Sequence, residues 1–409
     1  MDITIFPGKL SGTVRAIPSK SQAHRLLICA AFADAPTTLF CPETNRDIEA
    51  TMGCLNALGA DITRTDSGYR VIPAKEIPRQ AALRCHDSGS TLRFLLPVAG
   101  ALGIDATFHL EGRLPSRPLS PLWEEMERMG YTLARPTADT VRCTGRLRAG
   151  EYVIDGGVSS QFITGLLLSA ALIPGKSRIR LTEKVESRPY ITMTQRAMEI
   201  FGKETSDFVV TGGTPFHSPG TLTVEGDWSN AAFFLAAKAL GSSVEVTDLS
   251  PDSPQGDRAV FDLLPALENS PVISAADIPD LVPILAVTAA CKNGAVFTDI
   301  RRLRLSKSAL KLRLRLKESD RVASVIAMVE ALGGKAQASE DTLTVYGTGL
   351  VGGTVDAMND HRIAMSAAIA ATACKAPVAI LGAECVGKSY PKFFEEYARL
   401  GGNYEQYLR

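Results

Sequence analysis

The sequence predicts an α/β protein with two domains, and three observations support this. The 409 residues are more than one ordinary hydrophobic core accommodates. Gly/Ser/Asp-rich loops run directly into apolar helices of small residues at six places along the chain. An amphipathic helix and short β-branched runs follow several of these apolar helices. We therefore expect one unit (strand, buried helix, strand, amphipathic helix, two strands) that recurs about every seventy residues, with three copies in each domain.

The six apolar helices lack a polar face, which predicts that they are buried. They are expected, with their loops, within 19–33, 87–102, 155–172, 225–240, 278–290 and 358–373. The amphipathic helices should end just before a C-capping glycine, and these glycines are Gly59, Gly130, Gly202, Gly333 and Gly401. Strands are expected at 61–64, 68–72 and 342–346. The N-terminal strand 2–6 could belong to either half, and the fourth copy begins at the 225–230 loop.

Composition excludes several classes of protein. Apolar residues make up 45% and charged residues 22%, as in soluble globular proteins, and 44 basic residues balance 44 acidic ones. Global charge therefore gives no reason to expect nucleic-acid or membrane binding. The eight cysteines form no C-x-x-C pair and no zinc-like spacing with histidine. With no leader pattern and no bilayer-length apolar run, we expect a reduced, cytoplasmic protein without a metal.

Cations beside the loops indicate an anion site. Lys20, Ser21 and Arg25 open the first apolar helix, whose free N–H groups also attract anions; the alternative is plain surface charge. Further cations stand on or beside the other loops: Arg93, Arg117, Arg188, Lys317, Arg321, Arg362 and Lys388. Neither a P-loop nor a Rossmann glycine motif is present, so phosphates would be held by Arg, Lys and backbone N–H groups. Together the cations predict a cleft for a polyanionic ligand.

Three residues are candidates for proton chemistry. Asp280 precedes an apolar helix, and its alternative role is that of an N-cap. Glu318 is flanked by cations, which suits proton transfer; alternatively it favours a helix dipole. His361 stands beside Asp360, where it could serve only to orient its neighbours.

The basic segment 299–317 interrupts the repeated pattern. Leucine alternates with Arg and Lys in it, which is typical of a strand with one solvated face. The run also allows a second class of function, a non-catalytic protein that binds anions or nucleic acid. It contains no interleaved aromatic residues, which argues against a nucleic-acid surface.

Several motifs occur in one order along the chain: Lys20-Ser21-x-x-His24-Arg25, Asp87-Ser88-Gly89-Ser90-Thr91-x-Arg93, Arg117-Pro118, Ser159-Ser160-Gln161, Arg188-Pro189-Tyr190, Lys317-Glu318-Ser319-Asp320-Arg321, Asn359-Asp360-His361-Arg362 and Lys388-Ser389-x-Pro391. In this combination the chain resembles the 5-enolpyruvylshikimate-3-phosphate synthases, a family of enolpyruvyl transferases. The resemblance implies an inside-out α/β barrel of three β-α-β-α-β-β units in each domain. It implies domains at 19–225 and at 1–18 plus 226–409, with the active site in a cleft that closes on substrate.

The resemblance also implies a reaction. The 5-hydroxyl of shikimate 3-phosphate adds to phosphoenolpyruvate, and the tetrahedral ketal then loses phosphate, without a cofactor. Asp280 would take the hydroxyl proton, while Glu318 and Lys20 serve the C3 proton and the phosphate. Shikimate 3-phosphate would contact Lys20, Ser21, Arg25, Ser159, Ser160, Gln161, Ser187, Asp280 and Lys317. Phosphoenolpyruvate would contact Lys20, Gly89, Arg117, Gln161, Arg321, Arg362 and Lys388. Glyphosate would occupy the phosphoenolpyruvate site, and the protein would be a monomer that binds neither nucleic acid nor membrane.

The chain departs from the family pattern at several positions. Asp87 and Arg313 replace asparagines of other members, Phe94 replaces a frequent proline, and 301–315 looks longer than usual. A related alternative is the sister transferase that acts on UDP-N-acetylglucosamine. It usually carries a reactive cysteine near phosphoenolpyruvate, whereas the nearest loop cysteine here is Cys85, and the 317–321 motif argues against it.

Overall fold

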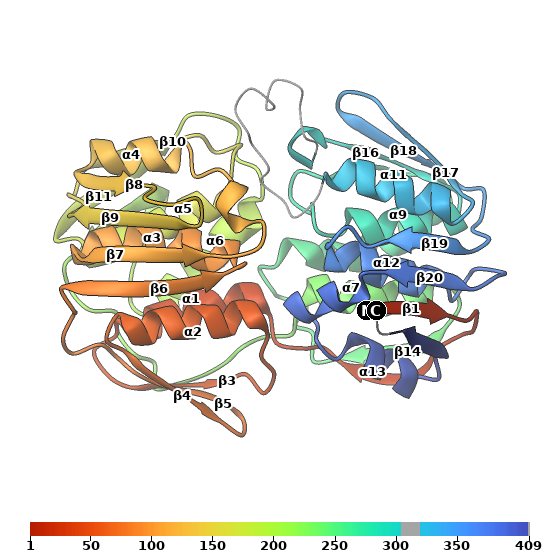
Figure 1. Cartoon of the computed structure of the whole chain (residues 1–409), viewed down its shortest axis with the longest axis horizontal. Coiled ribbons are helices and arrows are strands. Elements are labelled where there is room, and N and C mark those ends of the chain that lie inside the picture. Colours follow the sequence, from red (N-terminus) through yellow and green to blue (C-terminus); the bar gives the residue numbers. More distant parts are fainter. Residues whose placement is uncertain (304–319, 408–409) are drawn as a thin grey trace. The chain divides into compact units, whose positions relative to one another are not determined.

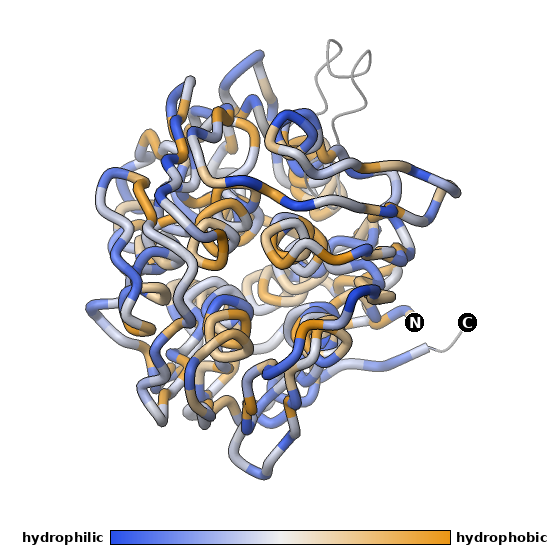
Figure 2. Tube along the Cα trace, turned by 90° about the vertical axis from the view of Figure 1, so that its left-hand side faces the viewer, coloured by the Kyte–Doolittle hydropathy of each residue, from blue (hydrophilic) through white to orange (hydrophobic). Residues whose placement is uncertain are grey.

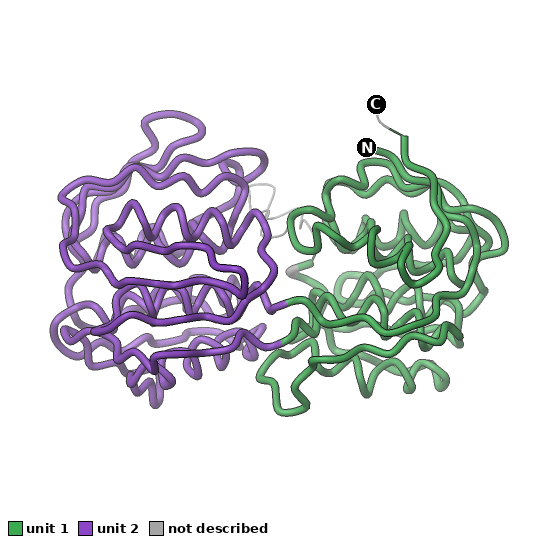
Figure 3. The backbone as a smooth tube through the Cα atoms, turned by 90° about the horizontal axis from the view of Figure 1, so that it is seen from below, with its two compact units in different colours: residues 1–17, 226–409 green, residues 18–225 purple. Residues whose placement is uncertain are grey.

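The computed structural model describes residues 1–303 and 320–407. The chain divides into two compact units, which are coloured separately in Figure 3. Unit 1 contains Met1–Ile17 and Gly226–Arg409, and unit 2 contains Pro18–Glu225. Within the described residues, no helix has the length and apolar character needed to cross a membrane.

Unit 2 consists of strands and α-helices in alternation, with a short 3-10 helix η1 (Leu114–Ser116) and another, η2 (Ser206–Phe208). Its helices are α1 (Lys20–Ala31), α2 (Arg46–Ala57), α3 (Gly89–Leu102), α4 (Leu122–Arg128), α5 (Ser160–Leu172) and α6 (Arg188–Ile200). Its strands are β3 (Thr37–Phe40), β4 (Asp61–Thr65), β5 (Gly68–Ile72), β6 (Gln80–His86), β7 (Asp105–Leu110), β8 (Tyr131–Ala134), β9 (Thr140–Gly145), β10 (Glu151–Ile154), β11 (Gly175–Leu181), β12 (Val209–Gly212) and β13 (Thr221–Thr223).

Unit 1 repeats this alternation (Figure 1). Its α-helices are α7 (Trp228–Ala239), α8 (Val260–Ala266), α9 (Val282–Cys291), α11 (Arg321–Ala331), α12 (His361–Ala370) and α13 (Phe393–Arg399). Its strands are β1 (Asp2–Ile5), β2 (Ser11–Arg15), β14 (Ser243–Thr247), β15 (Val272–Ser274), β16 (Ala295–Thr298), β17 (Lys335–Ala338), β18 (Thr342–Tyr346), β19 (Gly353–Asp356), β20 (Val378–Leu381) and β21 (Tyr404–Tyr407). Its 3-10 helices are η3 (Gly256–Ala259), η4 (Leu267–Asn269), η5 (Arg301–Leu303) and η6 (Ala383–Lys388).

The described strands form three sheets in each unit, and four of the six sheets share one order. In the sheet β6-β7-β9-β8, β6 pairs with β7 in parallel, and the hairpin β8–β9 adds antiparallel strands beyond β7. The sheet β15-β16-β18-β17 has the same pattern. A parallel pair requires a crossover, which here is the buried helix, whereas the antiparallel strands close with short connections. The repeated unit predicted from the sequence is therefore confirmed.

Two of the six predicted copies have fewer strands in their sheets than the other four. The sheet β10-β11-β12 has three strands, and β14 pairs with β2 alone among the described residues. Strands distant in sequence complete other sheets: β13 pairs with β3, and β1 lies between β20 and β21. Helical and strand periodicity reports local structure only, so it does not reveal which distant strand fills an edge.

The six apolar helices are buried, as predicted. In unit 2, α3 packs on α5, and in unit 1, α9 and α12 pack on each other and on α7. All ten residues of α12 are buried, as are nine of the ten in α9. Hydrophobic colouring in Figure 2 follows these inner helices, whereas the outer strands and loops are largely hydrophilic. Helices inside and sheets outside are the arrangement that the family resemblance implies.

Candidate active site

The first apolar helix of unit 2 places two predicted cations in different surroundings. Lys20 is its first residue, and its Nζ lies 3.0 Å from a carboxylate oxygen of Asp47. Arg25 is only 2% exposed. Its guanidinium donates to the hydroxyls of Thr194 at 2.7 Å and Thr164 at 3.2 Å, and burial lowers its pKa to about 10. The surface-charge alternative is therefore wrong for Arg25.

The start of α3 gathers three predicted residues. Ser88 caps this helix, and Gly89 is its first residue. A Cβ at Gly89 would lie 2.8 Å from Nη1 of Arg117, so this arginine passes close over the helix end. Arg93 is 2% exposed and donates to the side-chain oxygen of Gln161 at 2.6 Å. Positive charge is thus concentrated at the positive end of a helix dipole, where an anion is favoured.

Arg93 retains binding capacity toward an anion. Its Nε and Nη2 atoms are buried and have no hydrogen-bond partner among the described residues. Burial, together with the nearby charge of Arg117, holds the pKa of Arg93 well below its usual value. An anion placed beside Arg93 and Arg117 would relieve both the repulsion and the missing hydrogen bonds. Sequence reasoning named Arg93 among the loop cations but assigned it no ligand.

The serine motif of α5 joins this group. Ser159 is the N-cap of α5 and accepts from the backbone N–H of Gln161. Gln161 donates from its Nε2 to the hydroxyl of Ser90 at 2.9 Å, while Ser160 is buried. Ser187 is the buried N-cap residue of α6, in the left-handed region at φ 54°. Unit 2 therefore brings Gly89, Arg117 and Gln161 together around Arg93.

A buried chain of polar side chains supports the α3 end. His24 Nδ1 lies 2.7 Å from the hydroxyl of Thr51, which lies 2.7 Å from the hydroxyl of Thr91. Thr91 donates to the Ser88 hydroxyl, also at 2.7 Å. Burial lowers the pKa of His24 to about 3, so the imidazole is neutral at physiological pH. The chain connects three helices to the cap of α3 without introducing a charge.

This neutral histidine predicts an acid-sensitive stability. The unfolded chain binds a proton at His24 below pH 6.5, but the folded protein binds it only near pH 3. Stability is therefore lost as pH falls through this window, by about 1.4 kcal/mol per pH unit. We expect His24→Asn, whose amide can still pair with Thr51, to flatten the fall in unfolding free energy between pH 6.5 and 5. Denaturant titrations would measure it, with His109→Asn on β7 as control; equal slopes in all three proteins would contradict the prediction.

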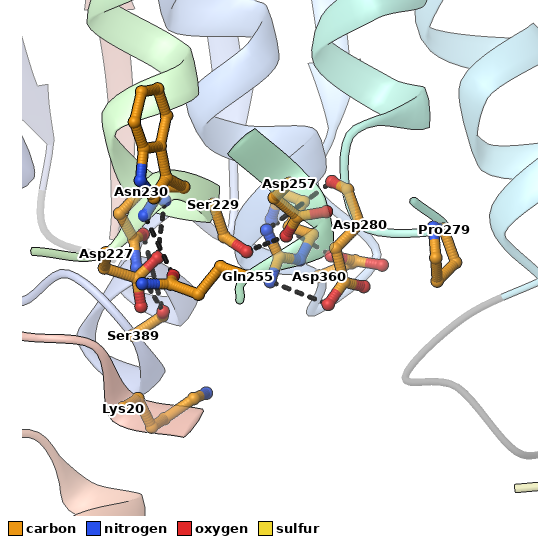
Figure 4. A network of polar contacts seen from close by, with 12 residues as sticks. Lys20, Asp227, Ser229, Asn230, Gln255, Asp257, Pro279, Asp280, Asp360 and Ser389 are labelled. Atoms are coloured by element: carbon orange, nitrogen blue, oxygen red, sulfur yellow. Dashed lines mark hydrogen bonds and ion pairs between the residues drawn. The ribbon is translucent and has the colours of Figure 1, made fainter. Parts of the chain in front are cut away.

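Unit 1 contains a buried ion cluster around Asp280 (Figure 4). Arg321 Nη1 and Arg362 Nη2 lie 2.6 Å and 3.0 Å from the two carboxylate oxygens of Asp280. Arg321 Nη2 also lies 3.5 Å from a carboxylate oxygen of Asp360, which caps α12. Leu281, not Asp280, occupies the N-cap position of α9, so the N-cap alternative for Asp280 is wrong. The geometry holds a carboxylate and two guanidinium groups at three helix starts.

The structure describes some of the remaining predicted residues of unit 1 and not others. Lys388 ends η6, and its Nζ lies 3.5 Å from the carbonyl oxygen of Asn359, just before Asp360 and Arg362. His361 is the first residue of α12 and is buried. Lys317, Glu318 and Arg313, with most of the basic segment, lie outside the described residues.

Three carboxylates at the site were assigned no role from the sequence. The sequence does mark Asp360, because it belongs to the Asn359-Asp360-His361-Arg362 motif and immediately precedes an apolar helix. Asp47 pairs with Lys20 from the first turn of α2, where an acidic residue is common. Asp257 lies buried on η3 and accepts a hydrogen bond from Ser229. No sequence pattern distinguishes Asp257, because only the packing of distant elements buries it.

Buried arginines at helix N-termini are an arrangement typical of proteins that bind small polyanions. In each unit, buried arginines meet the start of an apolar helix. Within the described residues no group of His, Cys, Asp and Glu could hold a metal ion. Arg93 has two buried nitrogen atoms without a hydrogen-bond partner among the described residues, whereas Asp280 in unit 1 pairs with two arginines.

Comparison with known proteins gives the family. The family model for EPSP synthase (3-phosphoshikimate 1-carboxyvinyltransferase) matches residues 6–397. Curated 3-phosphoshikimate 1-carboxyvinyltransferases of Clostridium beijerinckii and Clostridium kluyveri are 36% and 34% identical, over 99% of this chain and 99% and 98% of their own lengths. A solved EPSP synthase from Acinetobacter baumannii shares the fold, with a TM-score of 0.78 at 23% identity, covering 99% of this chain and all of that one. The chain belongs to the EPSP synthase family and is a transferase.

Proposed function

We propose that the polar residues at the helix starts of the two units carry out the family reaction by addition and elimination. The protein transfers the enolpyruvyl group of phosphoenolpyruvate to shikimate 3-phosphate, a step of the shikimate pathway. The 5-hydroxyl adds to C2 while C3 gains a proton. The resulting tetrahedral ketal loses a proton from C3 and releases phosphate. The observation that carries the proposal is the Asp280 cluster, in a chain that matches the family over almost its whole length.

Asp280 takes the proton of the attacking hydroxyl in this proposal. Its carboxylate is held by two guanidinium groups, and its side chain retains 14% exposure, so substrate can reach it. Arg321 and Arg362, with Lys388, attract the charges of phosphoenolpyruvate. Glu318 and Lys20 serve the C3 proton and the departing phosphate. Lys317 binds shikimate 3-phosphate.

Unit 2 supplies the remaining substrate contacts. Lys20, Ser21, Ser159, Ser160, Gln161 and Ser187 bind shikimate 3-phosphate, and Lys20, Gly89, Arg117 and Gln161 bind phosphoenolpyruvate. Arg25 also binds shikimate 3-phosphate in the proposal: Nε and Nη2 donate to three protein oxygens, whereas Nη1 donates to one and has a second N–H for the substrate. Support comes from the concentration of N–H donors at the starts of α1, α3 and α5.

The test is phosphate release on mixing the protein with phosphoenolpyruvate and shikimate 3-phosphate. A parallel reaction replaces the second substrate by UDP-N-acetylglucosamine. We expect release with shikimate 3-phosphate alone. Phosphate release with the sugar nucleotide only would contradict shikimate 3-phosphate as the acceptor substrate. Absence of phosphate release in both reactions would contradict the proposed enolpyruvyl transfer.

The domain limits and the state of the protein in solution form a further part of the proposal. Residues 19–225 are taken as one domain and 1–18 with 226–409 as the other, within one residue of the two compact units, and residues of both bind the substrates. The protein is a monomer that acts in the cytoplasm. Light scattering coupled to size exclusion would give a mass of 43.7 kDa for the monomer, and twice that value would contradict it.

A further inference from the structure

Asp257 is a buried carboxyl group that the reaction described above does not use. It belongs to η3, is 2% exposed, and accepts a hydrogen bond from the Ser229 hydroxyl at one oxygen. Its other oxygen, Oδ1, is buried without a hydrogen-bond partner among the described residues. An ionised carboxylate in this position would be costly, since half of its acceptor capacity is unmet.

The surroundings of Asp257 are already rich in carboxylates. Figure 4 shows the carboxyl groups of Asp257, Asp280 and Asp360 gathered in one place. Three charged groups act on Asp257 directly: Asp227 at the start of α7, Asp280 in the loop before α9, and Arg362 on α12. Arg321 pairs with Asp280 and with Asp360, and so belongs to the same cluster. The nearby charged residues on the segment of Asp257 itself, Arg258 and Asp262, are exposed. Even without Asp257, the cluster contains three carboxylates and only two buried arginines. Burial and the charge of Asp280 raise the pKa of Asp257 to about 7, despite the opposing charge of Arg362.

The position of η3 is fixed by its loop. Gln255, two residues earlier, accepts from the backbone N–H of Trp228 at 3.0 Å and donates to the carbonyl oxygen of Gly226 at 2.8 Å. These bonds attach the loop to the start of α7, where Ser229 also lies. The backbone that carries Asp257 is therefore held at the start of α7, and the Ser229 hydroxyl holds its side chain there.

We infer that Asp257 is a positioning residue for the proposed reaction: its neutral carboxyl leaves Arg362 directed toward Asp280 and the anionic substrate, and its ionisation draws Arg362 away. The inference rests on the proposed function of Arg362 and Asp280. Ionised Asp257 competes for the guanidinium and adds repulsion toward phosphoenolpyruvate. Binding of phosphoenolpyruvate therefore weakens as pH rises through 7, independently of the proton that Asp280 accepts.

The test compares wild type, Asp257→Asn and Asp252→Asn by initial rates between pH 5.5 and 8.5. Asparagine has the shape of the neutral acid and can still accept from Ser229. The ratio of wild-type to variant KM for phosphoenolpyruvate cancels the titration of the substrate itself. We expect this ratio for Asp257→Asn to rise about three- to tenfold from pH 6 to 8.5, with kcat at pH 6 nearly unchanged. The exposed Asp252, on the same loop, should give a constant ratio.

Two measurements keep the inference falsifiable if a variant folds poorly or turnover is absent. Ser229→Ala removes a hydrogen-bond donor that favours the ionised form of Asp257. The rise in the KM for phosphoenolpyruvate should therefore occur at higher pH in this variant than in wild type. Thermal midpoints need no substrate: because the folded pKa is raised, wild type should lose stability relative to Asp257→Asn between about pH 4 and 7 and stay level above. Any one of three results would overturn the inference. These are a KM ratio that does not change with pH, a rise in KM at the same pH in Ser229→Ala as in wild type, and thermal midpoints of wild type and Asp257→Asn that change with pH in parallel. Absence of phosphate release by wild type would instead contradict the proposed function.

Discussion

Replacing Asp280 by asparagine is expected to lower kcat by about 10²–10⁴-fold, the range contributed by a positioned general base. The variant keeps the shape of the side chain and one oxygen that can accept from Arg321 or Arg362. It cannot take a proton from the attacking hydroxyl. The loss should appear in single-turnover rates as well as in kcat, because the chemical step itself is slowed.

Stability must be measured beside activity, since Asp280 also balances two buried cations. Removing one partner of a buried pair costs about 3–5 kcal/mol, so Asp280→Ala should lower the thermal midpoint more than Asp280→Asn. Asp280→Glu is the matched comparison, because it retains the carboxylate at a shifted position and should keep more activity than the asparagine variant. If each folded Asp280→Asn molecule turns over as fast as wild type, Asp280 is not the base.

Gly89→Ala is expected to raise the KM for phosphoenolpyruvate and the inhibition constant of glyphosate by about tenfold or more. The new Cβ would approach Nη1 of Arg117 to 2.8 Å and Nη1 of Arg93 to 3.3 Å. The arginine ends are flexible and can shift, so folding should change little, but they would no longer point at the ligand. Misplacement of one charge-assisted pair costs about 1.5–3 kcal/mol, which is at least tenfold in affinity.

Gly53→Ala is the matched control for this substitution. Gly53 lies on α2 in the same unit, and a Cβ there meets nothing within 4 Å. Steady-state kinetics with glyphosate as a competitor of phosphoenolpyruvate would measure both variants. If Gly89→Ala and wild type are inhibited equally, Gly89 does not belong to the phosphoenolpyruvate site.

Local patterns were sufficient to predict the repeated unit. The helices at α3, α5, α9 and α12 were recognisable because they lack a polar face, and such helices are stable only when buried. The amphipathic helices were recognisable by their glycine ends: Gly59 and Gly333, for example, have φ angles of 102° and 84°, which side chains with a Cβ rarely adopt. The order of motifs was sufficient to indicate the family.

The sequence names the candidate site residues but does not indicate how they are arranged. The sequence marked Asp280, Arg321 and Arg362 separately, and an N-cap role for Asp280 remained open until the structure showed its two arginine partners. Arg25 could not be distinguished from a surface cation, because burial depends on Thr164 and Thr194, more than 130 residues away in the chain.

The alternation of strands and helices, the buried character of six helices and the cations at the starts of several of them could all be read from the sequence. These are properties of neighbouring residues, and local periodicity and capping record them. Three features became visible only in the folded protein: β13 completes the sheet of β3, β1 lies between β20 and β21, and Asp257 is buried near Asp280. Edge pairing and the proton affinity of a buried carboxyl depend on contacts between segments far apart in the chain, which no local pattern encodes.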